Sequence, residues 1–251
     1  MNKIFLALQE PETRSWFPVA RVEKLLDSYV LHYTKGVEKF PKFLGFGRMN
    51  KLDCVYFSRD LFPLLKNRVI SRNRADFSAF ADWLGKDASA LSAFDELAVT
   101  GGLRGTDTIE LIPVPEINEN GLYQASFFIH GFRYLSPSAR EEFLKLAIGD
   151  QLSLVPEPEN EFDGHALRLT HRGSSQFIGY VPRYFSMEFS ALLKAQKDAV
   201  VVTVMRVNDG APFAFRVLCE LVAPWPEDFD SCREDEFRSL VDVPRATHVI
   251  A

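Results

Sequence analysis

The sequence predicts an α+β protein built from two units, because strand-like alternation recurs along the chain and helical periodicity appears in separate blocks between the strands. Two further observations support two units. The 251 residues exceed one typical domain of about 100–150 residues. A stretch rich in Pro and Asn, Ile112–Gly121, interrupts the chain near its middle and is typical of a linker.

The first unit is predicted to be a small sheet followed by helices. Alternation is clearest in Tyr29–Thr34, and the apolar residues after Asp60 recur at helical spacing. Asp76 and Gly85 are suitable caps for one of the helices. We expect strands at 3–9, 16–22, 29–34 and 54–57, helices at 61–69, 77–84 and 89–99, and a closing strand at 108–113.

The second unit is predicted to be a small, partly closed barrel carrying two helices. Ser136-Pro137 is a helix start and Gly149 a helix stop, and Asn208-Asp209-Gly210 indicates a hairpin. Short strands separated by tight turns favour a barrel. The expected order is strands at 124–132, 151–155, 166–170, 176–181, 200–207 and 213–222, with helices at 139–148 and 184–195.

Composition excludes several classes of protein. Hydrophobic residues make up 47% and charged residues 25%, enough to bury a core. Three scattered cysteines form neither a disulfide framework nor a zinc pattern, and no apolar run approaches the roughly 20 residues of a membrane span. The apolar block after Lys3 is too short for a signal peptide. We expect a soluble cytoplasmic protein without membrane contact, metal or cofactor.

Charge limits the kind of nucleic-acid contact that is possible. The net charge is −5, and no segment carries the large positive charge of a non-specific nucleic-acid binder. Contact with nucleic acid would therefore depend on a few well-placed groups. The predicted domains are 1–115, 121–223 and an acidic C-terminal tail at 224–251, which we expect to be solvated or loosely docked.

Four motifs stand in order in the second unit: Gly131–Tyr134, Gly149–Leu154, Glu157–Leu167 and Ile178–Arg183. Their order and spacing resemble the HIRAN domain, with its G-x-R-Y, G-D-x-L-x-L, P-x-N-x-[YF]-D-x-x-A and [IV]-G-[YH]-[VL] signatures. The resemblance covers about residues 124–222. It implies an OB-like β-barrel with helices and an ability to hold the 3′ end of single-stranded DNA.

The resemblance also implies a set of DNA-binding residues. Asp163 matches the carboxylate that accepts the terminal hydroxyl proton, and Tyr134 and Phe162 match positions that stack on the last bases. The remaining candidates are two arginines for phosphates, an asparagine for the sugar or the loop backbone, and one further aromatic wall: Arg133, Arg183, Asn160 and Phe213.

Other interpretations of these residues stay open. Asp163-Gly164 is also a common turn, in which Asp bonds its own backbone, and Phe162 could belong to the core. The three glutamates at 157, 159 and 161 would repel phosphate. On an extended loop they would share one side with Asp163, which leaves a metal-dependent DNase as a less favoured alternative.

The first unit shows a looser resemblance to another family. Tyr29–Gly36, Asp60–Arg68 and Gly101–Thr106 are similar to the N-terminal subdomain of HipA-type toxin kinases, although no Pro-Glu-Gly follows Leu65. This resemblance implies a partner or regulatory module and no phosphotransfer, because no kinase core is present. The basic stretch from Arg59 to Arg74 is either a solvated helix face or a contact for an acidic partner.

The sequence thus predicts a two-domain binding protein whose HIRAN-like unit engages single-stranded or end-bearing DNA. No residue is assigned a catalytic role, and an enzyme is the less favoured reading. The alternative function is a component of a toxin–antitoxin operon, in which the first unit binds a HipA-type kinase or another operon partner. End polarity, sequence preference and oligomeric state do not follow from the sequence.

Overall fold

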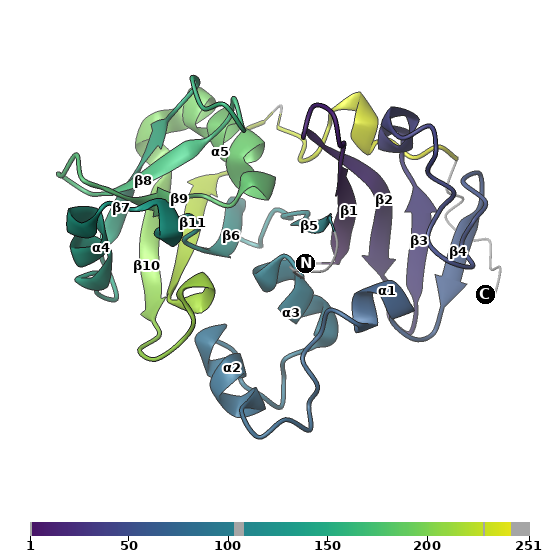
Figure 1. Cartoon of the computed structure of the whole chain (residues 1–251), viewed down its shortest axis with the longest axis horizontal. Coiled ribbons are helices and arrows are strands. Elements are labelled where there is room, and N and C mark those ends of the chain that lie inside the picture. Colours follow the sequence, from purple (N-terminus) through teal and green to yellow (C-terminus); the bar gives the residue numbers. More distant parts are fainter. Residues whose placement is uncertain (1, 103–107, 228, 242–251) are drawn as a thin grey trace. The chain divides into compact units, whose positions relative to one another are not determined.

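A computed structural model describes residues 2–102, 108–227 and 229–241. The chain forms two compact units, and each contains segments that are distant in sequence. The first unit comprises 1–70, 92–114 and the chain from 230 onward, and the second comprises 71–91 and 115–229. Each unit has its own sheet with helices, which confirms the predicted α+β class (Figure 1).

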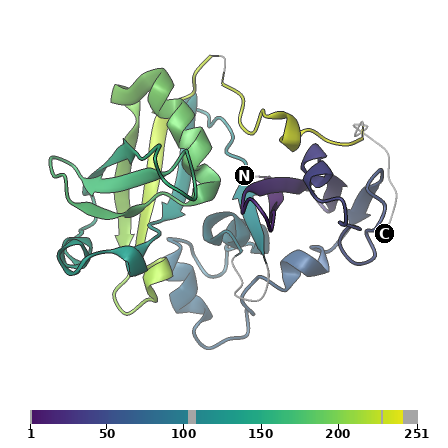
Figure 2. The same ribbon diagram turned by 45° about the horizontal axis from the view of Figure 1, so that its top comes forward.

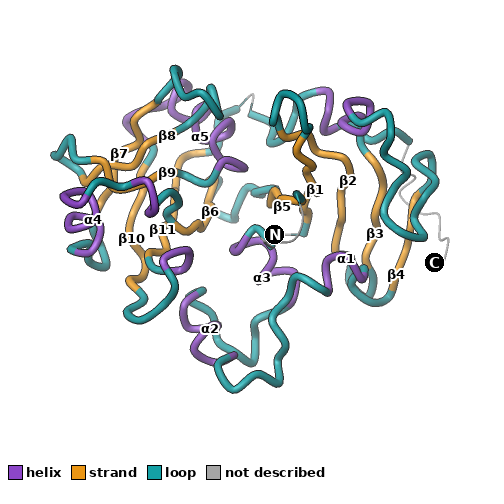
Figure 3. Tube along the Cα trace, viewed as in Figure 1, coloured by secondary structure: helices purple, strands orange, loops and turns teal. Residues whose placement is uncertain are grey.

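An antiparallel five-stranded sheet forms the centre of the first unit, in the order β4-β3-β2-β1-β5 (Figure 3). All of its predicted strands are present, with small shifts at their ends. Their bounds are β1 Lys3–Gln9, β2 Trp16–Lys24, β3 Tyr29–Tyr33, β4 Val55–Ser58 and β5 Ile109–Pro113.

Short helices cover this sheet. They are η1 Lys35–Lys39, α1 Pro63–Lys66 and α3 Ala93–Thr100. Ser92 caps α3, since its hydroxyl accepts a hydrogen bond from the Asp95 amide at 3.1 Å. The core joins Ile4 and Leu6 of β1 to Leu65 of α1 and Phe94 of α3.

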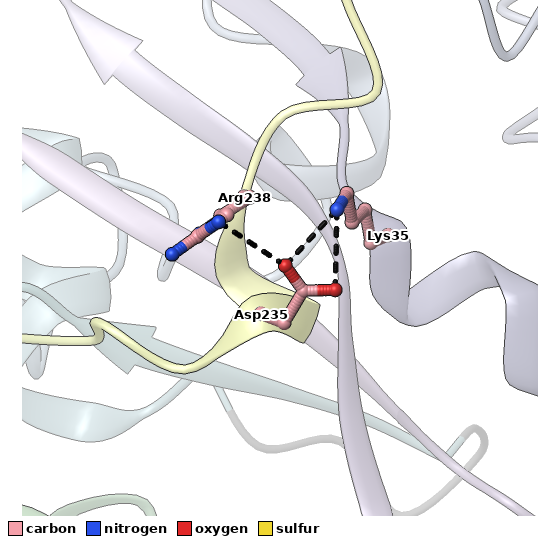
Figure 4. Close-up of polar contacts among 3 residues, drawn as sticks. All are labelled: Lys35, Asp235 and Arg238. Atoms are coloured by element: carbon pink, nitrogen blue, oxygen red, sulfur yellow. Dashed lines mark hydrogen bonds and ion pairs between the residues drawn. The ribbon is translucent and has the colours of Figure 1, made fainter.

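The described residues 230–241 pack within the first unit, in contrast to the loosely docked tail that we expected. They contain the helical turn η5 (Asp235–Phe237), which lies beside η1 and β2 (Figure 2). Phe237 is buried and packs edge-on against Phe5, with ring centroids 4.9 Å apart. The Asp235 carboxylate pairs with Lys35 at 3.0 Å and with Arg238 at 3.4 Å (Figure 4). The predicted tail beyond residue 241 lies outside the described residues.

The second unit contains a curled six-stranded antiparallel sheet in the order β6-β11-β10-β7-β8-β9. His130, just after β6, forms a bridge with Tyr180 at the end of β9, with both N···O distances 2.9 Å. This bridge joins the two edges of the sheet into a half-barrel, as predicted. The strands are β6 Leu122–Phe128, β7 Gln151–Pro156, β8 Leu167–His171, β9 Phe177–Tyr180, β10 Val201–Val207 and β11 Val217–Pro224.

Helices complete the second unit: α4 Pro137–Leu144, α5 Arg183–Gln196 and the short turns η2 Phe132–Tyr134, η3 Lys197–Ala199 and η4 Phe213–Phe215. Both predicted helices of this unit are therefore present. α5 buries Phe185 and Phe189, which pack against Phe127 of β6. α2 (Phe77–Trp83) also belongs to this unit, because Phe80 and Trp83 both pack on Phe215.

The predicted domain boundaries, read as limits of independent folding, remain a prediction. Contacts group 71–91 with the second unit and the C-terminal segment with the first. Within the basic stretch, Arg74 pairs with Asp76 and Arg68 donates to the Gly102 carbonyl. These contacts favour a structural role for both arginines. Most of the predicted Gly101–Thr106 segment falls at 103–107, outside the described residues.

Candidate nucleic-acid interface

Arg133 and Tyr134 lie on a turn that one glycine makes possible. Gly131 precedes η2 with φ 84°, and a Cβ there would lie 2.9 Å from Cδ2 of Tyr180. The turn leaves Tyr134 67% exposed. The Arg133 guanidinium covers one face of the Tyr134 ring at 4.7 Å and donates to the Tyr134 hydroxyl at 2.6 Å. The pair therefore presents a cation beside an exposed aromatic ring.

Phe213 contacts the same turn, although it lies far from that turn in sequence. It lies in η4 and not in the last strand, where the sequence had placed it, because Val217 is the first residue of β11. Its ring stacks on Phe132, with centroids 3.6 Å apart and planes 11° apart. Phe213 remains 49% exposed. It is thus an aromatic surface held in place by a neighbour.

The loop between β7 and β8 carries Asn160, Phe162 and Asp163. Oδ1 of Asn160 accepts hydrogen bonds from the Phe162 and Asp163 amides at 3.0 and 3.2 Å, so Asn160 fixes the loop's backbone. Oδ1 of Asp163 accepts from the His165 amide at 2.8 Å, the turn contact that was one open interpretation. Phe162 is 65% exposed, which excludes the core interpretation.

Glu157 forms hydrogen bonds and an ion pair with neighbouring residues of the site. Its carboxylate accepts from Asn160 Nδ2 at 2.8 Å and from the Tyr180 hydroxyl at 2.9 Å, and lies 3.8 Å from Arg168. The hydrogen bond from Asn160, with smaller contributions from Tyr180 and Arg168, lowers the pKa of Glu157. Its charge is therefore partly compensated, whereas Glu159 and Glu161 are exposed.

Tyr180 connects the loop between β7 and β8 with the turn after Gly131 and, through His130, with the start of α5. Its hydroxyl bonds Glu157 of the loop, and its backbone pairs with His130, the residue before Gly131. The His130 ring in turn contacts the Tyr184 ring, with centroids 6.3 Å apart, at the start of α5. Burial lowers the pKa of His130 to about 4, so this connecting ring is neutral at pH 7.

Arg183 is the first residue of α5 and follows Pro182, which occupies the N-cap. Within the described part of the chain, its guanidinium has no hydrogen bond or ion pair. The structure thus brings Arg133 and Tyr134 into direct contact and holds Asn160, Phe162 and Asp163 in one loop. It links these two parts and Arg183 through Tyr180, His130 and Tyr184.

The sequence analysis did not assign roles to Phe132, Tyr180, His130 or Arg140. Arg140 of α4 lies over the Phe132 ring at 5.4 Å and donates to the Arg133 carbonyl at 3.2 Å. Phe132 and Tyr180 lie inside the motifs Gly131–Tyr134 and Ile178–Arg183, so their place in the motif was a usable signal. No pattern in the sequence indicated Arg140, which approaches the turn from a separate helix.

The carboxylates of the loop do not form a metal site. The loop is a succession of turns and not an extended strand, so alternation does not align its four acidic residues. Among the described residues, no cluster of three or more His, Cys, Asp or Glu side chains could hold a metal ion. In the same ranges, no helix combines the length and the apolar character needed to cross a membrane.

Comparison with known protein families finds a match in this unit. The half-barrel and its four motifs fall in residues 122–225, which match the family model of the HIRAN domain. The predicted resemblance to HIRAN is thereby confirmed for this region, and the HipA-like resemblance of the first unit receives no support. No curated protein matches the chain.

Two solved structures show a weak likeness. A protein from Lactobacillus plantarum is 17% identical, with a TM-score of 0.33, covering 40% of this chain and 89% of its own. The HIRAN domain of human HLTF is 14% identical, with a TM-score of 0.29, covering 42% of this chain and 81% of its own. Likenesses this weak support no further argument about the site.

Proposed function

We propose that the HIRAN region of this protein binds single-stranded DNA and holds its 3′ end. A HIRAN domain suggests a nucleic-acid-binding role. The observation that carries the finer proposal is the set of contacts through Tyr180, which link the loop after β7 to the turn of Arg133 and, through His130 and Tyr184, to the start of α5 at Arg183. Three exposed rings belong to the parts that these contacts bring together. The rings belong to Tyr134, Phe162 and Phe213.

Each group suits a part of a DNA end. Exposed aromatic rings stack on bases at about 1–3 kcal/mol each, without regard to sequence. Arginines beside them suit the flanking phosphates. Asp163 uses one carboxylate oxygen for its own turn, and the other oxygen is the proposed acceptor for the terminal hydroxyl. The exposed Glu159 and Glu161 disfavour extra phosphate, so we expect modest affinity that is best measured at low salt.

Asp163→Asn tests the proposal without breaking the turn, because the Asn side chain keeps the oxygen that accepts from the His165 amide. We expect the affinity for a strand with a free 3′ hydroxyl to fall by about 1.5–3 kcal/mol, as for a lost hydrogen bond to a charged group. Fluorescence anisotropy of a labelled strand measures this change.

Asp209→Asn is the matched control. In the wild type, the Asp209 carboxylate lies on an exposed turn and pairs with Arg216 at 2.9 Å. Both variants remove one negative charge, which by itself strengthens phosphate binding. If the Asp163 variant binds as tightly as the Asp209 variant, the role proposed for Asp163 is wrong.

For the first unit, a role in binding a protein partner remains a proposal. It rests only on the sequence resemblance to HipA-type kinases, so a toxin–antitoxin operon partner stays a secondary hypothesis. Co-purification with the product of a neighbouring kinase gene would test it.

A further inference from the structure

One helix of the second unit presents a row of positive charge that starts at the candidate interface. In α5, Arg183, Met187, Ala191 and Lys194 recur every three or four residues and share one face. Met187 is partly exposed, and Ala191 and Lys194 are exposed. The opposite face is buried and contains Phe185, Phe189 and Leu192. The exposed face of α5 is therefore cationic at both ends.

Within α5, no acidic side chain lies on this exposed face. Glu188 is the only acidic residue of α5, and it is buried, where its carboxylate accepts a hydrogen bond from Tyr123 at 2.7 Å. Beyond the helix, Lys197 continues the row in η3. Within the described residues, Lys194 and Lys197 form no ion pair.

The row ends at a cavity of about 220 Å³ beneath the end of α5. Its wall includes the apolar Leu152 and Leu154 of β7 together with Ser153. Two cations, Arg172 and Lys197, line it against one acid, Asp198. The volume is below the roughly 300–1,000 Å³ of a drug-sized site, so it suits a group as small as one base.

We propose that the exposed face of α5 is a second contact surface for single-stranded DNA, along which the strand runs from Arg183 to the cavity at Arg172. This inference rests on the proposed function, because it extends the strand held at the 3′ end. Charge complementarity and continuity with Arg183 support a polynucleotide as the occupant. Fourteen residues of helix span about 21 Å.

That span sets the length of strand required. A strand stacked at about 3.4 Å per nucleotide needs about six nucleotides to follow α5, and an extended strand needs fewer. Single-strand-binding barrels of the OB type cover about 4–16 nucleotides, so the combined surface is of ordinary size. A strand of about three nucleotides occupies the end site alone, whereas one of about twelve reaches both surfaces.

The test compares oligothymidylates of about three and about twelve nucleotides, each with a free 3′ hydroxyl, on the full chain. We expect the longer strand to bind more tightly. Lys194→Glu should lower the affinity for the longer strand only, by about tenfold near 50 mM salt. It should also reduce the slope of log affinity against log salt concentration by about 0.7, the value for one phosphate contact on a single strand.

Two variants control for other effects. Lys145→Glu makes the same charge change at the residue that follows α4, where Lys145 already pairs with Glu142 at 2.8 Å, and it should leave the binding of both strands unaffected. Lysines also stabilise helix C-termini, so Lys194→Gln, with a melting curve, separates lost binding from lost folding. The Gln variant should melt as wild type does and still lose affinity for the longer strand.

The outcomes separate the two proposals. If the short strand binds and the long strand binds no better, or if Lys194→Glu weakens both strands equally, the α5 surface is refuted and the end site stands. If the short strand does not bind, the proposed function fails and the α5 inference fails with it. If polyglutamate displaces the long strand at equal charge concentration, an acidic protein replaces DNA as the better partner.

Discussion

Tyr180 is the residue on which the candidate interface most depends. Its hydroxyl holds Glu157, its backbone closes the sheet at His130, and its ring lies against Gly131. The sequence analysis placed Tyr180 in a motif but gave it no role, because a side chain that links two loops leaves no periodic signal. The sequence analysis proposed roles for Asp163 and Tyr134, because the resemblance to the HIRAN domain matches these positions residue by residue; these roles stay a prediction.

Two histidines with lowered pKa, the buried His32 and the half-buried His130, predict how stability depends on pH. Burial lowers the pKa of His32 and of His130 to about 4, whereas an unfolded histidine titrates near pH 6.5. Between about pH 6.5 and 4 the unfolded chain binds protons that the folded chain does not, so the free energy of unfolding falls as the pH falls. Each histidine contributes at most about 3 kcal/mol to this loss.

Urea unfolding at pH 7 and pH 5 measures the effect. Carboxylates also contribute at low pH, so the comparison is between wild type and His130→Gln, which should lose less stability on acidification. His171→Gln, which replaces a half-exposed ring beside Asp150, controls for the substitution itself. An equal pH dependence in wild type and His130→Gln would show that the pKa of His130 is not lowered in the folded protein.

At the scale of elements, α2 supports the turn that carries Phe213. Phe80 is buried and packs edge-on against Phe215 at 5.8 Å, and Trp83 stacks on the same ring at 6.3 Å. Asn208 donates to the carbonyls of Trp83 and Phe215 at 3.0 and 2.7 Å. These contacts hold η4, and through it Phe213, against Phe132.

Phe80→Ala should therefore destabilise the second unit by about 3–5 kcal/mol, the usual effect of removing a buried aromatic ring. Hydrogen exchange should speed up in peptides covering 213–224. Peptides from β1 and β2 of the first unit serve as the internal control and should change less. Equal acceleration in both sets would mean that α2 does not act specifically on the second unit.

The elements that the sequence predicted well are those with a local signal. The alternation in β3 and the apolar face of α5 appear in the structure with small shifts at their ends. The membership of α2 in the second unit was not predictable, because it depends on contacts with Phe215, far along the chain. Phe213-Ala214-Phe215 reads as strand alternation, but Pro212 and the stacking on Phe132 set a helical turn there.

At the scale of the whole molecule, the two units are not consecutive stretches of the sequence, because the chain passes from one unit to the other several times. Residues 71–91 lie in the second unit, and the described residues 230–241 return to the first. In that segment, Phe237 covers Phe5, Asp235 pairs with Lys35, and the Ser239 hydroxyl lies 2.9 Å from Nδ1 of His32. The predicted boundaries of independent folding stay a prediction, which the truncation below addresses.

Removing the chain after Phe229 should therefore lower the stability of the first unit. This is expected although the deleted residues follow the second unit in sequence. Loss of the buried Phe237 ring alone should cost about 3 kcal/mol or more. Thermal melting compares this truncation with one after Val241, which keeps every described contact. Indistinguishable melting curves would contradict the packing of η5.

The central claim is that the HIRAN region holds a DNA 3′ end, and binding of matched strands with a free or a phosphorylated 3′ end tests it most directly. A 3′ phosphate removes the hydroxyl proposed to bind Asp163 and adds negative charge beside Asp163, Glu159 and Glu161. The account predicts that, at low salt, the full chain binds the free end at least tenfold more tightly, about 1.4 kcal/mol. Equal affinity for the two strands would contradict it.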